Sequence, residues 1–391
     1  MSDTNAPTLI AGVPSDNMTL FHRIRFDAHD PAALIIKPDG TRLLILRDVE
    51  LDVAKRDARA DEIHAYEDFE PEGGLSADRP TRAAQAAAEC LRRLGADHVI
   101  ADGSLGLLFV DQLDRAGIGV ELDPSLGIAD RRAKTEEEVR ALRDAQRVTE
   151  AAVRMACELI ATAKVNGDGA LTDPSRAGGL LTSERVKALI ISHLAENGAL
   201  TAGPIVAGGP VGASCHNSGT GVLRTGEPVI IDVFPKHLLT GYCGDCTRVV
   251  IHGKVPGEVA RMHDTVLKAK RAGIAATRAD ATGEDVHRAV VEVIEAAGYA
   301  MGFPKGHIPM EGPPTGECTM PHGTGHGIGL ELKEPPLLDF GGPQLVVGDA
   351  VTVEPGLYAP GLGGIRIEDL VIVTEDGCEN LNELPEGLEW A

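Results

Sequence analysis

Two histidines four positions apart, His322 and His326, stand in a run where every second residue is a glycine. Histidines with this spacing share one face of a helix in the helical zinc motif, whose second residue is a glutamate. Here the second residue is Gly323, and each glycine costs a helix about 1 kcal/mol relative to alanine. The run therefore predicts an irregular or extended segment whose backbone passes close to another group. A glycine-rich surface loop with two incidental histidines explains this stretch alone equally well.

Two aspartates interrupt apolar, strand-like runs earlier in the chain. Asp232 lies in the run 229–234, and Asp245 lies in the returning run 241–248. If the hairpin closes symmetrically around residues 238–239, the two aspartates face each other with Cβ atoms about 5 Å apart, where like charges destabilise a sheet. A cation between them would remove that repulsion. The alternative is that Asp245 lies in the turn and never faces Asp232.

The same arrangement recurs in the last part of the chain. Glu354 ends the strand-like run 351–354. In the run 364–369, the two-residue period of a strand puts Arg366 and Glu368 on one face. A single acid in an apolar strand can protect an exposed sheet edge. Several such acids, together with the glycine-rich histidines, favour a metal site instead.

Four carboxylates and one imidazole are the wrong set for structural zinc, which prefers thiolates. They suit two divalent ions about 3.5–4 Å apart, a pair that activates a water and polarises a carbonyl or phosphoryl oxygen. Mn²⁺ is the expected ion, with Co²⁺, Fe²⁺ or Zn²⁺ as alternatives. From these residues alone we expect a hydrolase with a dinuclear site, without an identified substrate.

The order of these residues resembles a known set of ligands. Asp232, Asp245, His326, Glu354 and Glu368 are similar to the five metal ligands of metallopeptidase family M24, which includes methionine aminopeptidase, Xaa-Pro aminopeptidase, prolidase and creatinase. The resemblance covers about residues 130–391 and implies a pita-bread catalytic domain with a pseudo-twofold repeat. The segments that resemble the family's signatures are 241–248, 322–329, 352–358 and 364–369.

At 391 residues the chain exceeds one core, and two domains are expected. After a loose, polar lead-in to about residue 20, alternating strands and helices predict an α/β N-terminal domain, residues 1–130. It resembles the N-terminal domain of creatinase and prolidase. A capping box, Thr135 with Glu138, opens a long helix to about Ala163. Residues 131–391 then repeat the order helix, helix, strand, strand, which predicts an α+β catalytic domain. The predicted strands are 33–37, 41–47, 98–101, 119–122, 228–234, 242–252, 350–354 and 364–373, and the helices are 80–94, 105–116, 135–163, 183–197, 258–276 and 283–297.

Composition excludes several classes of partner. The net charge of −22 disfavours nucleic acid and anionic membranes, because phosphate groups are bound by basic surfaces. No signal peptide is recognisable, and no apolar run approaches the roughly 20 residues that span a bilayer. Seven scattered cysteines fit reduced thiols better than a disulfide framework. We therefore expect a cytoplasmic protein, and a homodimer.

The family resemblance also implies roles for residues outside the ligand set. His216 and His322 fall where family members keep substrate-contacting histidines, and both are expected to hold the substrate and stabilise the oxyanion. Within the ligand set, the reaction itself leads us to expect that Glu354 carries a proton in addition to binding metal. Arg366 is placed with the substrate-binding residues, although its main expected effect is to order Glu368. Lys333 departs from the family, which usually has a histidine there; it could donate to the scissile carbonyl or pair with neighbouring acids at the surface.

Taken together, these residues predict a dinuclear metallopeptidase that cleaves the bond before proline at peptide N-termini, as an Xaa-Pro aminopeptidase or dipeptidase. Its partner would be a small peptide with proline in the second position. Two alternatives remain open: a metal-free, creatinase-like amidinohydrolase, and a non-catalytic binding protein on the same fold. Both would be expected to have lost metal ligands, whereas all five are present.

Overall fold

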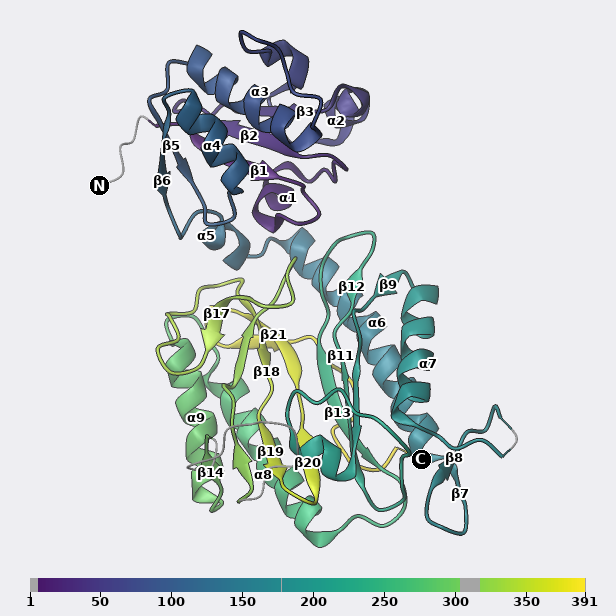
Figure 1. Ribbon diagram of the computed structural model, residues 1–391. Coiled ribbons are helices and arrows are strands. Elements are labelled where there is room, and N and C mark those ends of the chain that lie inside the picture. Colours follow the sequence, from purple (N-terminus) through teal and green to yellow (C-terminus); the bar gives the residue numbers. More distant parts are fainter. Residues whose placement is uncertain (1–5, 177, 303–316, 391) are drawn as a thin grey trace. The chain divides into compact units, whose positions relative to one another are not determined.

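Two units with separate internal contacts make up the chain, Met1–Arg131 and Arg132–Ala391 (Figure 1). The computed structural model describes residues 6–176, 178–302 and 317–390, and each unit is treated by itself. In these described ranges no helix has both the length and the apolar character needed to cross a bilayer.

The N-terminal unit is built on a six-stranded mixed sheet in the order β4-β3-β2-β1-β5-β6. Alternate residues of the central strands point to opposite faces, and each face has its own apolar core. One core joins the strands to α3 and α4, and the other joins them to α1 and α2. The unit therefore has three layers. Its elements are β1 (Thr8–Gly12), α1 (Met18–Ile24), β2 (Ala32–Ile36), β3 (Arg42–Leu46), α2 (Leu51–Asp57), β4 (Glu62–Ala65), α3 (Arg79–Arg93), β5 (His98–Ala101), α4 (Leu107–Arg115), β6 (Gly119–Leu122) and α5 (Ile128–Arg132).

The predicted strands 33–37 and 41–47 are confirmed as β2 and β3, and those at 98–101 and 119–122 are confirmed as β5 and β6. The prediction of a loose lead-in up to residue 20 was wrong. β1 pairs with both β2 and β5 in the interior of the sheet, and Asn17 caps α1 by accepting from the Leu20 amide at 3.0 Å. A strand buried on both faces lacks the polar alternation that identifies a half-exposed strand, and its apolar run is only three residues long.

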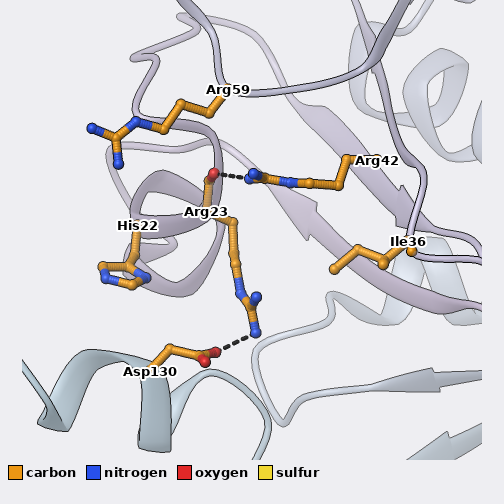
Figure 2. A pocket seen from close by; sticks show the side chains of 7 residues that line it. His22, Arg23, Ile36, Arg42, Arg59 and Asp130 are labelled. Carbon is orange, nitrogen blue, oxygen red and sulfur yellow. Dashed lines mark hydrogen bonds and ion pairs between the residues drawn. The ribbon is translucent and has the colours of Figure 1, made fainter.

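A cavity of 340 Å³ lies within the N-terminal unit (Figure 2). Arg23 forms an ion pair with Asp130 across it, and Arg42 donates to the backbone carbonyl of Arg23. His22 is part of its wall. None of the residues predicted to bind metal or substrate lines this cavity.

The C-terminal unit repeats one arrangement twice. In the first half α6 and α7 pack on a three-stranded sheet, β10-β11-β13, and in the second α8 and α9 pack on the strands that follow them (Figure 1). The pita-bread fold class is confirmed. The helices are α6 (Glu136–Ala161), α7 (Ser183–Glu196), α8 (Gly257–Ala276) and α9 (Gly283–Ala296). The strands are β7 (Lys164–Val165), β8 (Leu171–Thr172), β9 (Ala199–Leu200), β10 (Ile205–Gly208), β11 (Pro228–Val233), β12 (Lys236–His237), β13 (Cys246–Ile251), β14 (Ala300–Met301), β15 (Thr319–Met320), β16 (Gly325–Gly327), β17 (Glu334–Leu338), β18 (Ala350–Val353), β19 (Gly356–Ala359), β20 (Gly363–Arg366), β21 (Asp369–Val373) and β22 (Cys378–Asn380).

The hairpin that carries Asp232 and Asp245 closes later than predicted. β11 pairs with β13 so that Asp232 faces Thr247, and the bridge between Lys236 and Cys243 continues the same register. The prediction that the two aspartates face each other directly was wrong. The tip of the hairpin pairs with β9 instead of turning symmetrically around residues 238–239. A register shift of two residues leaves each side chain on the same face of the sheet, so both aspartates still lie on one side.

The run 364–373, predicted as one strand, forms two. β20 pairs with β19, whereas β21 pairs with β18 in a different sheet, and Glu368 lies in the link between them. The prediction of a continuous strand was wrong because the chain passes from one sheet to the other here. No glycine or proline stands between Arg366 and Asp369, so the sequence pattern does not show the break.

A buried ion network lies directly beneath this link. Arg248 of β13 pairs with Asp369 at 2.8 Å and donates to the carbonyl of Glu368 at 2.6 Å. Lys270 of α8 pairs with Asp369 from the other side and with Glu386 at 2.6 Å. Burial alone would raise the pKa of Asp369, but the charges of Arg248 and Lys270 hold it below its ordinary value.

The only tryptophan of the chain, Trp390, packs on the core formed by α6, α7 and β13. Its indole nitrogen donates to the carbonyl of Val249 at 3.2 Å. This contact fixes the end of the described chain to the strand that also carries Arg248.

Replacing Asp369 with alanine should destabilise the C-terminal unit strongly. Arg248 and Lys270 are 1% and 0% exposed, and the variant leaves both charges without their shared carboxylate. Breaking such a buried pair costs about 3–5 kcal/mol, measured as the free energy of unfolding in urea. Arg143→Ala is the matched control because its 2.8 Å pair with Glu379 is exposed, and it should cost less than about 1 kcal/mol. Equal losses in the two variants would contradict the expectation.

Candidate metal centre

Asp232 and Asp245 approach the centre from the first sheet of the C-terminal unit. Asp232 lies in β11 and is 7% exposed, and Asp245 directly precedes β13 and is 4% exposed. Gln146 of α6 fixes the backbone at Asp245, accepting from its amide at 2.9 Å and donating to its carbonyl at 2.7 Å. The side chain of Asp245 is therefore aimed by a buried amide on a neighbouring helix.

His326 lies in β16, where glycines allow the backbone to pass very close to its neighbours. A Cβ at Gly325 would lie 1.9 Å from the carbonyl oxygen of Thr352. The ring Nδ1 of His326 lies 3.0 Å from the carbonyl oxygen of Gly327, which can only accept, so Nδ1 carries the proton. Nε2 is left with its lone pair, 3.8 Å from Asp245 Oδ2 and 3.6 Å from Glu354 Oε1.

The two glutamates come from the second half of the unit. Glu354 follows β18, where its amide donates to the carbonyl of Thr324 at 2.7 Å. Glu368 follows β20 and bridges the two halves, because its amide donates to the carbonyl of Thr247 and its Oε2 accepts from the Thr247 hydroxyl at 2.8 Å.

These side chains fit a divalent cation. Donor atoms of Asp245, His326 and Glu368 all lie within 4.8 Å of one another, and all three residues are buried. In addition, Oδ1 of Asp232 and Oδ1 of Asp245 are buried without a hydrogen-bond partner. Buried carboxylate oxygens are costly unless they are paired or coordinate a metal. An imidazole lone pair among unpaired carboxylates is a donor set that metal ions such as Mn²⁺ or Zn²⁺ accept.

The proton affinities of the cluster reflect the same crowding. Burial, followed by the charges of neighbouring carboxylates, raises the pKa of Asp245 and of Glu368 well above their ordinary values. Burial also raises the pKa of Glu354 to about 7. Burial lowers the pKa of His326 to about 4, so the ring is neutral at pH 7, the form that binds metal.

A cavity of 540 Å³ opens onto this cluster and is lined by all nine residues predicted for the site. Arg366 lies in its wall with its donors engaged by the protein. It pairs with Asp232 at 2.5 Å and donates to the Tyr358 hydroxyl at 2.7 Å, to the carbonyl of Cys215 at 3.2 Å and to the Thr247 hydroxyl at 3.3 Å. Its guanidinium therefore orders the wall of the cavity.

Both ring nitrogens of His322 are also engaged. Nδ1 lies 2.8 Å from the carbonyl oxygen of Gly323, so it carries the proton, and Nε2 accepts from the Tyr358 hydroxyl at 2.9 Å. Burial lowers the pKa of His322 to about 3, so it is neutral. A chain of contacts thus runs from Asp232 through Arg366 and Tyr358 to His322.

His216 and Lys333 line the more exposed part of the cavity. Burial, with contributions from Lys333 and Arg366, lowers the pKa of His216 below its ordinary value. Lys333 has no ion-pair partner within the ranges that the structure describes. Glu334, one of the acids with which it could have paired, is buried and binds Lys134 at 2.6 Å.

Sequence reasoning did not find Gln146 or Tyr358. Gln146 is fully buried in α6, and an amide inside a largely apolar helical stripe was the available signal. Tyr358 falls inside the segment 352–358 that resembles a family signature, but neither the family pattern nor its spacing gave it a role.

The sequence profile of metallopeptidase family M24 matches residues 140–375, and the chain belongs to this family. A probable dipeptidase PepE from Mycobacterium bovis is 37% identical over 186 residues, which are 47% of this chain and 45% of that protein. The chain therefore matches about half the length of this curated relative.

Two solved structures are similar over nearly the whole chain. A dipeptidase PepE from Mycobacterium ulcerans has a TM-score of 0.73 at 26% identity, with 98% of this chain and 92% of that chain covered. An Xaa-Pro dipeptidase from Bacillus anthracis has a TM-score of 0.78 at 24% identity, with 98% and 94% covered, and this likeness shows the fold.

Asp245→Ala and Glu368→Ala should each remove metal and activity together, because each variant removes a buried donor from the cluster. Wild-type protein should carry about two ions per chain by elemental analysis. Glu292→Ala, an exposed acid on α9, is the control and should keep its metal. Full metal occupancy in Asp245→Ala would refute the assignment.

In the metal-free protein, Glu368 should reduce stability as the pH rises. The pKa of Glu368 is higher in the folded state than its ordinary value. Between these two pH values the folded state binds more protons than the unfolded state, so the free energy of unfolding falls as the pH rises. In EDTA, the Tm of the wild type relative to Glu368→Gln should therefore fall between pH 5 and pH 8. Added Mn²⁺ should reverse this difference. A constant difference between the two proteins would contradict the raised pKa.

Proposed function

We propose that this chain is a dinuclear metal-dependent peptidase that cleaves the bond before proline at peptide N-termini, as an Xaa-Pro aminopeptidase or dipeptidase. One observation supports it above all: two buried carboxylate oxygens without a hydrogen-bond partner, on Asp232 and Asp245, line the same 540 Å³ cavity as the neutral imidazole of His326. Asp232, Asp245, His326, Glu354 and Glu368 are the proposed metal ligands. The proposed domains are a creatinase/prolidase-like N-terminal domain, 1–130, and a pita-bread catalytic domain, 131–391.

Bound divalent ions would supply the acidity that activates a water and polarises the peptide carbonyl. Glu354, which lines the same cavity, would take the proton of that water and pass it to the leaving nitrogen. His216 would donate to the substrate from the exposed side of the cavity. His322, held neutral by burial and by Tyr358, would contact the substrate through its ring.

A dipeptidase activity agrees with the names of the relatives, which include a probable dipeptidase and an Xaa-Pro dipeptidase. A creatinase-like amidinohydrolase or a binding protein is the alternative, and neither requires a full ligand set. The ion is proposed to be Mn²⁺, with Co²⁺, Fe²⁺ or Zn²⁺ as alternatives. A cytoplasmic location, a homodimer and the lack of nucleic-acid and membrane partners stay predictions.

Proline in the second position should be required for efficient cleavage. The lining of the cavity includes the apolar residues Ile205, Phe234 and Leu337, which suit a compact ring. A pocket of this kind discriminates by roughly 10- to 100-fold in kcat/KM. The measurement compares Ala-Pro with Ala-Ala on the metal-loaded enzyme. Equal turnover of the two would move the protein to a broader class of aminopeptidase.

A further inference from the structure

The charges around the cavity of the metal centre are unevenly distributed. Asp245, His326 and Glu368 are buried at its floor, with exposed fractions of 4%, 7% and 2%. Lys333 and His216 are exposed residues of the same lining. The cavity therefore has an acidic, metal-binding floor and an outer part that carries a cation and a neutral hydrogen-bond donor.

Among the described residues that line the cavity, Lys333 is the cation that remains available to bind a ligand. Arg366, the other cation of this lining, is 4% exposed and is neutralised by Asp232. Lys333 has no ion-pair partner in the described ranges. It lies in the same lining as His216 and adds, after burial, to the lowering of the pKa of that ring.

A free C-terminus is the anion that the reaction itself would bring close to this position. In a dipeptide the carboxylate carbon is separated from the scissile carbon by two backbone atoms, roughly 3–4 Å. In a tripeptide it lies one residue further away, up to about 3.8 Å more. A carboxylate so near the bond being cleaved must lie inside the cavity, where a lysine ammonium can give it a charge-assisted hydrogen bond.

We propose that Lys333 binds the terminal carboxylate of the substrate and thereby makes this site selective for dipeptides over longer peptides and over peptides with a blocked C-terminus. This inference rests on the proposed peptidase function. It assigns to Lys333 recognition of the leaving residue, in place of a contact to the scissile carbonyl. The two roles predict different behaviour, because every substrate has a scissile carbonyl but only a dipeptide has its carboxylate at this distance.

The test compares kcat/KM for Ala-Pro, Ala-Pro-amide and Ala-Pro-Ala on the Mn²⁺-loaded enzyme. The wild type should prefer Ala-Pro over both others by on the order of 10-fold, since Lys333 is exposed and its ion pair is partly screened. In Lys333→Met the ratio of Ala-Pro to Ala-Pro-amide should fall close to one, chiefly through a higher KM for Ala-Pro. Lys333→Arg should restore most of the ratio. Lys268→Met, an exposed lysine on α8, is the control and should keep the wild-type ratio.

Two results would overturn the inference. If Lys333→Met lowers kcat/KM by the same factor for all three substrates, Lys333 donates to the scissile carbonyl instead. If the wild type does not distinguish Ala-Pro from Ala-Pro-amide, the carboxylate is not recognised.

Failure of the proposed function gives a different pattern. If the wild type cleaves Ala-Ala as well as Ala-Pro, the proline requirement fails. The preference for a free carboxylate is then measured as the ratio of kcat/KM for Ala-Ala to kcat/KM for Ala-Ala-amide. If it cleaves none of these, calorimetric binding of Ala-Pro and of Ala-Pro-amide to the Mn²⁺-loaded protein gives the same ratio. In that case the inference is supported if the wild type binds Ala-Pro more tightly than Ala-Pro-amide and Lys333→Met does not. It is refuted if the wild type binds the two ligands equally.

Discussion

Like charges held out of water at short range are the constraint on which the C-terminal unit depends. Asp232, Asp245 and Glu368 converge from largely apolar strands and links, and among the described residues the cation that pairs with one of them is Arg366, which binds Asp232. The two halves of the unit have to meet here, because Thr247 of one half holds Glu368 of the other. The fold thus brings together groups that repel one another, and a divalent cation is what makes the arrangement favourable.

Much of this could be read from the sequence, because the acids stand out against their surroundings. Asp232 and Glu354 interrupt or end runs of β-branched residues, and the alternating glycines around His326 predict a close backbone approach, which Gly325 makes against Thr352. The long helix α6 begins with the predicted capping box at Thr135. Local patterns of period and capping were sufficient for these elements, whereas the pita-bread fold and the family were predicted from the resemblance of the five ligands and their signature segments.

What could not be read depends on contacts between distant segments. The register of the hairpin around Asp232 is set by pairing of its tip with β9, about 40 residues earlier in the chain. The break before Glu368 is set by a change of sheet, and the hydrogen bonds that occupy His322 and Arg366 depend on Tyr358. No local periodicity encodes such partners, so the residues were found but their hydrogen-bond states were not.

The position of Trp390 makes the two units optically distinguishable. Because it is the only indole in the chain and it packs on the core of the C-terminal unit, intrinsic fluorescence excited at the tryptophan band reports that unit and is silent for the N-terminal one. Far-ultraviolet circular dichroism, in contrast, sums the helices of both. A fluorescence transition that coincides with the dichroism transition would mean that the units melt as one cooperative body, whereas separated transitions would give each unit its own stability without cutting the chain.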